Sequence, residues 1–458
     1  MALSLRVDTD LALCPGKDHE FTLQPGDIVT AVLAVADREP LIDVPAAQAW
    51  SALCATDRWW RTWSDDVTYD GPGGDQVRRS LVTLRLLTYS PSGAPVAAPT
   101  SSLPEELGGE RNWDYRFAWP RDASIGIAAF LGLGKTAEAR GFLYWLLHAS
   151  RLQRPRLPAL LTIDGRTVPP EDSPDGWSGY RSSRPVRFGN GARDQHQLDG
   201  YGWVLDGAWQ LVRAGHRLYG ETWRALSAFT DFVATRWPDP DAGIWEVRGP
   251  ARHYVHSKLM AWLALDRALR IAATHRTSTR RQRRWQHARA SLGQAILTRG
   301  VDSNRPALVR AFDDSELDAA LLLAPLVGLL DPTSPVIVGT VDAIRRELSN
   351  GPFVYRYRPG HDGLTGTEGA FLPCSFWLVQ ALARTGRLSE AEVLFSELAE
   401  ACNPLGLYPE EIDPRSGKYL GNYPQALTHA ALVQAALAVR DARAAAEDRA
   451  PRRTRRAP

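Results

Sequence analysis

Residues 256–274 read HSKLMAWLALDRALRIAAT, with apolar side chains recurring at helical spacing. This pattern is typical of an α-helix with one buried face. It recurs along most of the chain, and a separate helix is expected at 46–64. The pattern predicts twelve helices in the body of the chain, of which residues 256–274 form one. The other eleven are expected at 74–88, 122–132, 137–150, 198–219, 223–236, 278–297, 315–330, 335–348, 367–385, 388–401 and 424–445.

The first 45 residues differ from this helical pattern. A turn at 22–27 precedes the run IVTAVLAV at 28–35, which is typical of a β-strand. Two or three strands bury no core of their own, so we expect 1–45 to be a β-rich remnant of a larger domain. The predicted organisation continues with a linker helix at 46–73, a helical body at 74–445 and a basic disordered tail at 446–458.

Composition excludes several classes of protein. The 458 residues carry 54 basic and 52 acidic side chains. The net charge of +2 lacks the large positive excess that is typical of nucleic-acid-binding proteins. No run reaches the ~20 apolar residues of a membrane span, and the N-terminal residues lack a signal peptide pattern. The four cysteines lie far apart, which predicts reduced thiols and a cytoplasmic location. The oligomeric state is not readable from the sequence.

Two Arg-rich stretches, within 276–284 and 449–456, stand apart from the rest. Without their ten Arg residues the chain carries 44 basic and 52 acidic side chains, so the body is acidic and suits a neutral ligand better than an anion. Each stretch could bind an anionic partner, although a solvated face and a disordered tail are the commoner interpretation.

Familiar nucleotide and serine-hydrolase motifs are absent. No GxxxxGK[ST], GxGxxG or GxSxG occurs, so nothing indicates a nucleotide cofactor or a nucleophilic serine. His253 and His256 form a close pair, but neither Cys nor paired carboxylates stand near them in sequence. We therefore predict no metal site and no cofactor.

Two loops carry carboxylates beside aromatic residues. Glu246 lies between Trp245 and Val247 in a Gly-bounded turn, where partial desolvation would raise its pKa. Glu410 and Glu411 are adjacent in a second loop, and one can stay ionised if the other is paired elsewhere. A protonated acid and an ionised base on separate loops are what hydrolysis of an acetal requires, although acidic loops without such a role are common.

Residues 110–122, ERNWDYRFAWPRD, alternate aromatic rings with hydrogen-bonding groups. Such a segment suits a sugar, whose apolar face stacks on a ring while its hydroxyls meet carboxylates and guanidinium groups. A salt-bridged surface loop is the alternative.

Five long motifs together resemble glycoside hydrolase family 15, which contains glucoamylases, glucodextranases and bacterial trehalases. The resemblance spans about Asp75 to Arg440. The motifs occur in the family's order at Ser102–Ser124, Asp194–Gly207, Gly243–Ala268, Thr367–Leu382 and Leu407–Leu432. It implies an (α/α)6 barrel, an all-α fold, and inverting hydrolysis of an α-glucosidic bond with release of β-D-glucose.

The resemblance also implies roles for individual residues. Glu246 matches the general acid and Glu410 the general base, and an inverting pair should stand ~6.5–9.5 Å apart. Trp113, Trp119, Trp177 and Trp245 fall in the loops assigned to the glucose pocket and are expected as its walls. The residues expected to bind the substrate are Trp113, Tyr115, Trp119, Arg121, Asp122, Trp245 and Arg356.

Three departures from the family pattern are visible. Only the last strands of the usual N-terminal β-sandwich are expected here, in 1–45. Pro120 removes a backbone donor beside Arg121 and Asp122 and could shift that pair. The stretch Gly189–Arg193 adds a charge near the substrate loop.

Three functions stay open at this point. The first is an exo-acting hydrolase acting on trehalose or on α-1,4- or α-1,6-glucans or oligosaccharides. The second is a carbohydrate-binding relative whose turnover is impaired by loss of most of the β-domain. The third is a sugar transferase or phosphorylase, against which the free-standing base Glu410 argues.

Overall fold

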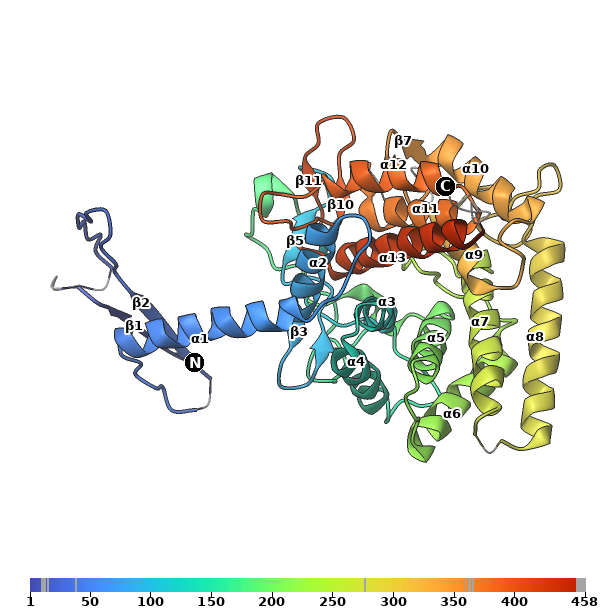
Figure 1. The fold of residues 1–458 in the computed structure, drawn as a ribbon, viewed down its shortest axis with the longest axis horizontal. Helices are drawn as coiled ribbons and strands as arrows, with labels where there is room; N and C mark the ends of the chain where they lie inside the picture. Colours follow the sequence, from blue (N-terminus) through green and yellow to red (C-terminus); the bar gives the residue numbers. More distant parts are fainter. Residues whose placement is uncertain are drawn as a thin grey trace, which may run out of the picture. The chain divides into compact units, whose positions relative to one another are not determined.

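The computed structural model describes residues 1–9, 14, 16–37, 39–275, 277–358, 360, 364 and 366–449. The chain divides into two units, Met1–Thr68 and Tyr69–Pro458. Figure 1 shows the fold coloured along the sequence.

A closed ring of helices forms the inside of the second unit. Each inner element packs against the next, and the last, α13, packs against the first, α3. Fourteen of the eighteen residues of α7 are buried, against five of twenty-one in the outer helix α8, because α7 is covered on all sides. The inner elements are α3 (Pro120–Gly132), α5 (Asp199–Arg213), α7 (Val255–Ala272), η3 with α9 (Ala319–Leu323, Ala324–Val327), α11 (Leu372–Arg384) and α13 (Ala426–Arg449).

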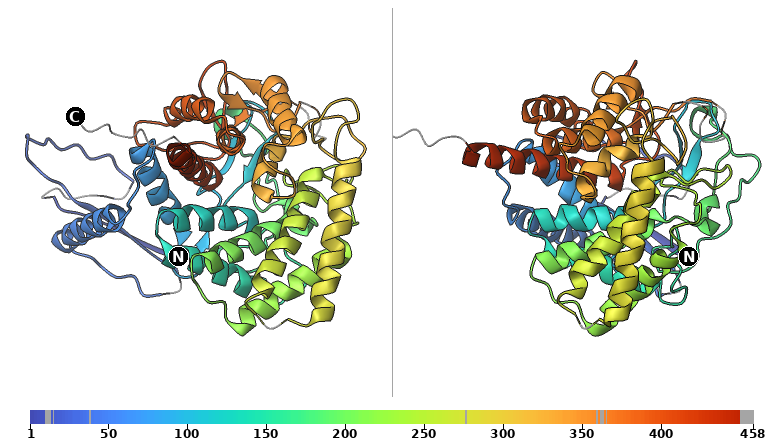
Figure 2. Two further views of the ribbon diagram at one scale, coloured as in Figure 1. Left: turned by 45° about the vertical axis from the view of Figure 1, so that its right-hand side comes forward. Right: turned by 90° about the vertical axis from the view of Figure 1, so that its right-hand side faces the viewer.

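The outer helices pack against this ring and lie around its periphery in Figure 1. Because inner and outer helices alternate along the chain, the unit is an (α/α)6 barrel, as the resemblance implied. Two further views are given in Figure 2. The outer helices are α2 (Gly74–Leu86), α4 (Thr136–Ala149), α6 (Gly220–Arg236), α8 (Thr279–Arg299), α10 (Pro335–Leu348) and α12 (Leu388–Ala399).

The fourth inner element departs from the helix expected at 315–330. Asp318 caps a 3-10 turn by accepting a hydrogen bond from the backbone N–H of Ala320, and Pro325 lies in the first turn of the four-residue helix α9. Gly328 ends α9 in the left-handed region at φ +85°. The prediction of one regular helix was therefore wrong, because the cap at Asp318, the proline at 325 and the glycine at 328 divide the segment.

At the C-terminal end, α13 continues to Arg449, four residues past the predicted boundary at 445. The other arginines expected in the tail lie outside the described residues, as does Arg276.

The first unit contains a β-hairpin and a helix. β1 (Ala2–Val7) pairs antiparallel with β2 (Ala31–Ala36). The helix α1 (Ala46–Asp65) has no buried residue, and its Trp59, Trp60 and Trp63 rings contact one another.

Long and short connections alternate around the barrel. Short segments such as 133–135 and 385–387 lead from an inner helix to the next outer one, so these neighbours run antiparallel. The long connections all lead from an outer helix to an inner one, and therefore gather at the end of the barrel where the inner helices begin. They carry the short pairs β3 (Thr88–Tyr89) with β4 (Ala94–Pro95), β5 (Ser101–Pro104) with β6 (Asn112–Asp114) and β7 (Ser349–Asn350) with β8 (Phe353–Val354), the sheet of β9 (Ala370–Phe371), β10 (Glu411–Ile412) and β11 (Tyr419–Leu420), and the turns η1 (Tyr180–Ser182) and η2 (Gly191–Asp194).

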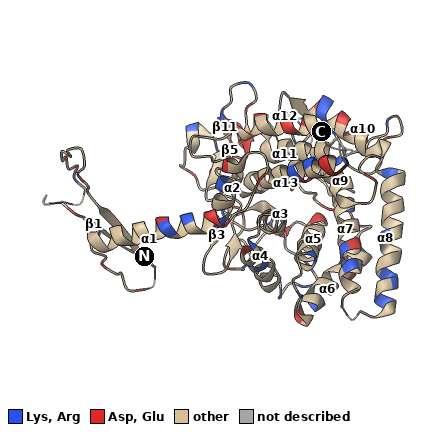
Figure 3. Cartoon of the chain, viewed as in Figure 1, with Lys and Arg blue, Asp and Glu red and all other residues tan. Residues whose placement is uncertain are grey.

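The arginines of the basic stretch from Arg280 to Arg284 lie at the start of α8, and Figure 3 shows Lys and Arg along that helix. Arg281 and Arg284 both form ion pairs with Asp231 of α6. These two guanidinium groups therefore join outer helices. Among the described residues, no helix is long and apolar enough to cross a bilayer.

We predict that Gly202→Ala destabilises the barrel, because the new Cβ would lie 2.3 Å from the carbonyl oxygen of Met260, where α5 meets α7. Overpacking of this kind costs about 1–3 kcal/mol. Gly141→Ala in α4 is the control, since its Cβ would meet nothing within 4 Å and the substitution favours the helix. Thermal unfolding should show a lower Tm for Gly202→Ala only; equal Tm values would contradict this account.

Candidate active site

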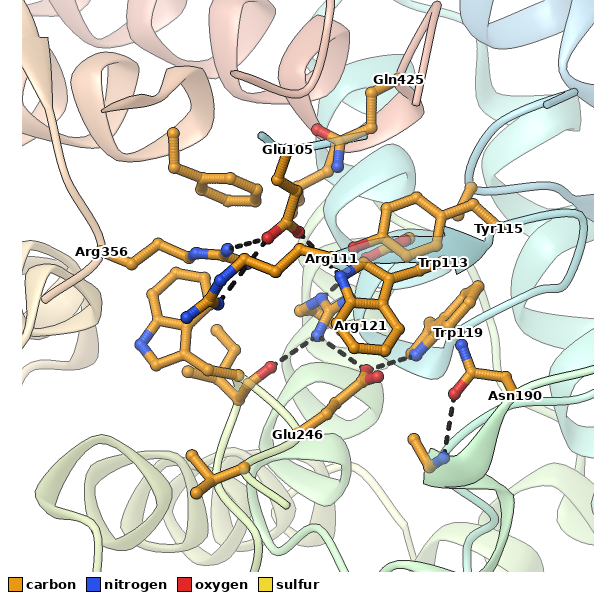
Figure 4. Close-up of a pocket in the computed structure, with 18 of the residues that line it drawn as sticks. Glu105, Arg111, Trp113, Tyr115, Trp119, Arg121, Asn190, Glu246, Arg356 and Gln425 are labelled. Carbon is orange, nitrogen blue, oxygen red and sulfur yellow. Dashed lines mark hydrogen bonds and ion pairs between the residues drawn. The ribbon is translucent and has the colours of Figure 1, made fainter. Parts of the chain in front are cut away.

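A pocket of about 790 Å³ lies among the long connections that precede the inner helices. Figure 4 shows its residues converging from several of these connections. Eight of the nine predicted catalytic and binding residues line it: Trp113, Tyr115, Trp119, Arg121, Asp122, Trp245, Glu246 and Arg356. Glu410 is fully buried and does not line the pocket, but it contacts the lining residue Tyr115.

Glu246 faces the pocket from the connection between α6 and α7. Its Oε1 accepts a hydrogen bond of 2.6 Å from Nε1 of Trp119 and lies 3.7 Å from Nη1 of Arg121 (Figure 4). Burial raises the pKa of Glu246, while Arg121 and the Trp119 hydrogen bond act in the opposite direction. The carboxyl group can therefore hold a proton and can also be stabilised after losing it.

Arg121 and Asp122 start the inner helix α3. Pro120 is the first residue of that helix, where a backbone N–H would have no partner within the helix anyway. Nε of Arg121 donates to Oδ1 of Asp122 at 2.8 Å, and its Nη1 donates to the Ile244 carbonyl oxygen at 3.0 Å. Both side chains line the pocket with Pro120 in place.

Glu410 lies directly before β10, beside Tyr115. Its Oε1 accepts a hydrogen bond of 2.7 Å from the Tyr115 hydroxyl, and its Oε2 accepts one of 2.9 Å from the Asn422 backbone N–H. Burial and the nearby charge of Glu105 raise the pKa of Glu410 to about 8. The group thus has a much higher proton affinity than an exposed carboxylate.

Arg356 ties three buried carboxylates together beside this pair. Its Nη2 lies 3.0 Å from Glu105, 2.6 Å from Glu368 and 3.0 Å from Glu411. Nη1 of Arg111 contacts Glu368 at 3.3 Å. Burial raises the pKa values of Glu105 and Glu411, whereas the charge of Arg356 lowers them.

The same three carboxylates are the group of described residues able to hold a metal ion, with oxygens within 4.8 Å of one another. The guanidinium of Arg356 already contacts all three. A permanently charged side chain therefore occupies the place of a cation.

The predicted tryptophan walls have different positions. Trp245 lines the pocket, and its Nε1 donates to Oδ1 of Asp318 at 2.9 Å. Trp119 also lines it but is only 2% exposed, so its hydrogen bond to Glu246 is its main contact with the site. Trp177 does not line the pocket; its side chain is 57% exposed and packs against Phe188, so the expectation for Trp177 was wrong.

Several lining residues were not selected from the sequence. Glu105, Arg111, Asn190, Arg248, Tyr357, Phe371 and Gln425 also line the pocket. Glu105 accepts a hydrogen bond of 3.0 Å from Nε1 of Trp113, and Arg248 pairs with Glu171. Glu105 and Arg111 fall in the same motif as Tyr115. Their charge within that motif is the feature of the sequence that could have identified them as pocket residues.

A family model described as glycosyl hydrolases family 15 matches residues 71–437. The chain belongs to this family. Its barrel and the eight pocket residues all lie within the matched segment or the helices that close it.

Curated relatives in the family are trehalases. The chain is 40% identical to the trehalase of Mycolicibacterium smegmatis over 398 residues, which are 86% of this chain and 59% of that protein. It is 38% identical to the trehalase of Mycobacterium tuberculosis over 447 residues, 95% of this chain and 65% of that protein. The chain thus spans less than two thirds of the length of these two relatives.

Solved structures share the fold at lower identity. A bacterial glucoamylase complexed with acarbose has a TM-score of 0.64 and 15% identity, covering 84% of this chain and 59% of that one. A glycosidase variant in complex with glucose has a TM-score of 0.63 and 22% identity, covering 80% and 96%. Both place the (α/α)6 barrel among glycosidase folds.

We predict that Glu410→Gln changes how stability depends on pH. Glu410 has a raised pKa in the folded protein, so its contribution to stability falls as the pH rises from about 4.5 to about 8. The Gln variant lacks this loss and should gain stability relative to wild type over that window, by up to about 4 kcal/mol at pH 8. Urea unfolding at pH 5, 6.5 and 8 measures the difference.

Glu397→Gln, at an exposed position of α12, controls for the loss of a carboxylate. If Glu410→Gln and Glu397→Gln differ from wild type by the same amount at all three pH values, the raised pKa of Glu410 is refuted.

Proposed function

We propose that this protein is an inverting glycoside hydrolase that cleaves α,α-trehalose to glucose. The observation that carries the proposal is the pairing of Glu246, whose oxygen contacts Trp119 and Arg121 in the pocket, with Glu410, which contacts the same pocket through Tyr115. The trehalases among its relatives support the choice of substrate.

In the proposed reaction, Glu246 donates its proton to the glycosidic oxygen as the C–O bond breaks. Trp119 and Arg121 then stabilise the carboxylate that forms, because both present N–H groups to Oε1. Arg121 and Asp122, held together at the start of α3, bind hydroxyls of the glucose unit being transferred.

Glu410 removes the proton from the attacking water on the opposite face of the ring. The hydroxyl of Tyr115 is the part of the pocket wall that contacts this carboxylate, so the water must approach beside Tyr115. Inversion requires carboxyl groups ~6.5–9.5 Å apart, which leaves room for that water.

In the proposed reaction, Arg248 binds the leaving glucose. Arg248 follows Glu246 by two residues. Because Glu246 gives its proton to the oxygen of the leaving glucose, that sugar must lie on the same side of the pocket as Glu246. Its guanidinium carbon lies 4.5 Å from the centre of the Trp113 ring, and Nη1 donates to Oε1 of Glu171 at 2.9 Å. A guanidinium held in this way presents its remaining N–H groups to sugar hydroxyls at low entropic cost.

The substrate and the stereochemistry are tested by incubating the protein with trehalose, maltose, isomaltose and soluble starch. Inversion of trehalose releases α- and β-glucose in equal amounts, whereas retention releases α-glucose alone, and NMR spectra before mutarotation separate the two. Glucose release from trehalose in preference to starch is expected. No glucose from any of the four would instead favour a carbohydrate-binding relative without turnover.

Glu246→Gln and Glu410→Gln should each lower kcat for trehalose by about 10²–10⁴-fold, the usual contribution of an acid or base in catalysis. Glu397→Gln should leave kcat unchanged, and Tm values confirm that each variant is folded. Near-normal turnover in either active-site variant would remove that residue from the mechanism.

Arg248→Ala should raise KM for trehalose about tenfold or more, since a hydrogen bond to a charged group contributes about 1.5–3 kcal/mol. Glu171→Gln should act in the same direction with a smaller effect, because it only loosens Arg248. Arg252→Ala, which removes a half-exposed partner of Asp314, is the control. An unchanged KM for Arg248→Ala would exclude Arg248 from the leaving-sugar site.

A further inference from the structure

The backbone of Glu246 adopts a conformation that residues other than glycine rarely take. Its φ is +58°, in the left-handed region, within a turn where its N–H donates to the Gly243 carbonyl at 3.3 Å. This conformation costs a non-glycine residue about 1–2 kcal/mol, so surrounding contacts must hold it in place.

Gln195 supplies such contacts. Its Nε2 donates to the carbonyl oxygens of Glu246 at 3.1 Å and Val247 at 3.3 Å. Its Oε1 accepts a hydrogen bond of 3.2 Å from Nε2 of Gln197, which fixes the amide with its NH₂ group toward the turn. One side chain therefore binds the carbonyl of the residue with the positive φ and the carbonyl of the residue that follows it.

The segment around Gln195 is itself fixed. The Gln195 backbone N–H donates to the carbonyl oxygen of Ala192 within η2, and the carbonyl oxygen of His196 accepts from the Ala242 N–H at 3.0 Å. The turn that carries Glu246 is thus connected at both ends to the segment before α5. Gln195 is half-buried and does not line the pocket, so it contacts the backbone of the acid rather than a sugar.

We propose that Gln195 is a positioning residue for proton donation: it holds the Glu246 backbone in the left-handed turn that directs the carboxyl group at the glycosidic oxygen. The inference rests on the proposed function, in which Glu246 is the acid. Without the two hydrogen bonds the turn relaxes and the carboxyl group moves away from Trp119, and a displacement of about 1 Å is enough to lower a rate 10²-fold.

Leaving-group chemistry separates this role from a general loss of structure. Trehalose needs a proton from Glu246, because the leaving glucose would otherwise depart as an alkoxide. In α-D-glucosyl fluoride, the C–F bond breaks with its electron pair on fluoride, water forms the new C–O bond, and the water proton passes to Glu410. That reaction needs the base and the glucose site but no proton donor.

The test uses Gln195→Met, which keeps the side-chain length and removes the donor. We expect kcat for trehalose to fall about 10–100-fold, while kcat for α-D-glucosyl fluoride changes less than about threefold. Gln210→Met in α5, which removes a half-buried amide bonded to Asp206, is the matched control and should leave both rates unchanged. Equal losses on the two substrates in Gln195→Met would overturn the proposal.

A double variant provides a second criterion. Added to Glu246→Gln, Gln195→Met should cost no further activity on trehalose, because residues that act through one another are not additive. A full additional loss would show that Gln195 acts elsewhere. Failure of the proposed function has a different signature, since wild type itself would then fail to hydrolyse trehalose.

Discussion

The alternation of inner and outer helices is the constraint on which the site depends. Each inner element starts at the same end of the barrel, so the long connections that precede α3, α5, α7, α11 and α13 meet there. In this way Glu246, which lines the pocket, and Glu410, which contacts its lining residue Tyr115, are brought to the same end of the barrel although they lie far apart in sequence. The positive ends of the inner helix dipoles also lie at this end, which favours the carboxylates collected there.

Arg356 makes that collection of carboxylates stable. Glu105, Glu368 and Glu411 come from three separate segments, and each contacts the same guanidinium nitrogen. Removing one partner of a buried ion pair costs about 3–5 kcal/mol, because the remaining charge is left uncompensated. The cluster therefore joins the connections before α3, α11 and α13, and its Glu105 and Arg356 act in opposite directions on the pKa of Glu410.

The sequence predicted the helical fold and most of the pocket, because periodicity and long motifs are local signals. It failed where the outcome depends on tertiary contacts. Trp177 lies in a long connection, as the tryptophans that line the pocket do, yet its side chain is exposed. The segment 315–330 has helical periodicity, but Pro325 and Gly328 interrupt it. Glu105 and Gln195 act through partners more than fifty residues away, at Arg356 and Glu246, and no sequence pattern links those pairs.

The charges around the two catalytic candidates differ in a way that favours proton transfer in one direction. Glu246 has Arg121 and the Trp119 N–H as its close partners, and both stabilise the carboxylate that remains when the proton leaves. Burial and the nearby charge of Glu105 favour the protonated form of Glu410 and outweigh the opposing effect of Arg356. During inversion the acid loses a proton beside a cation while the base gains one beside an anion. These charges are fixed in the folded barrel before any substrate is bound. They therefore favour both proton transfers when the reaction takes place.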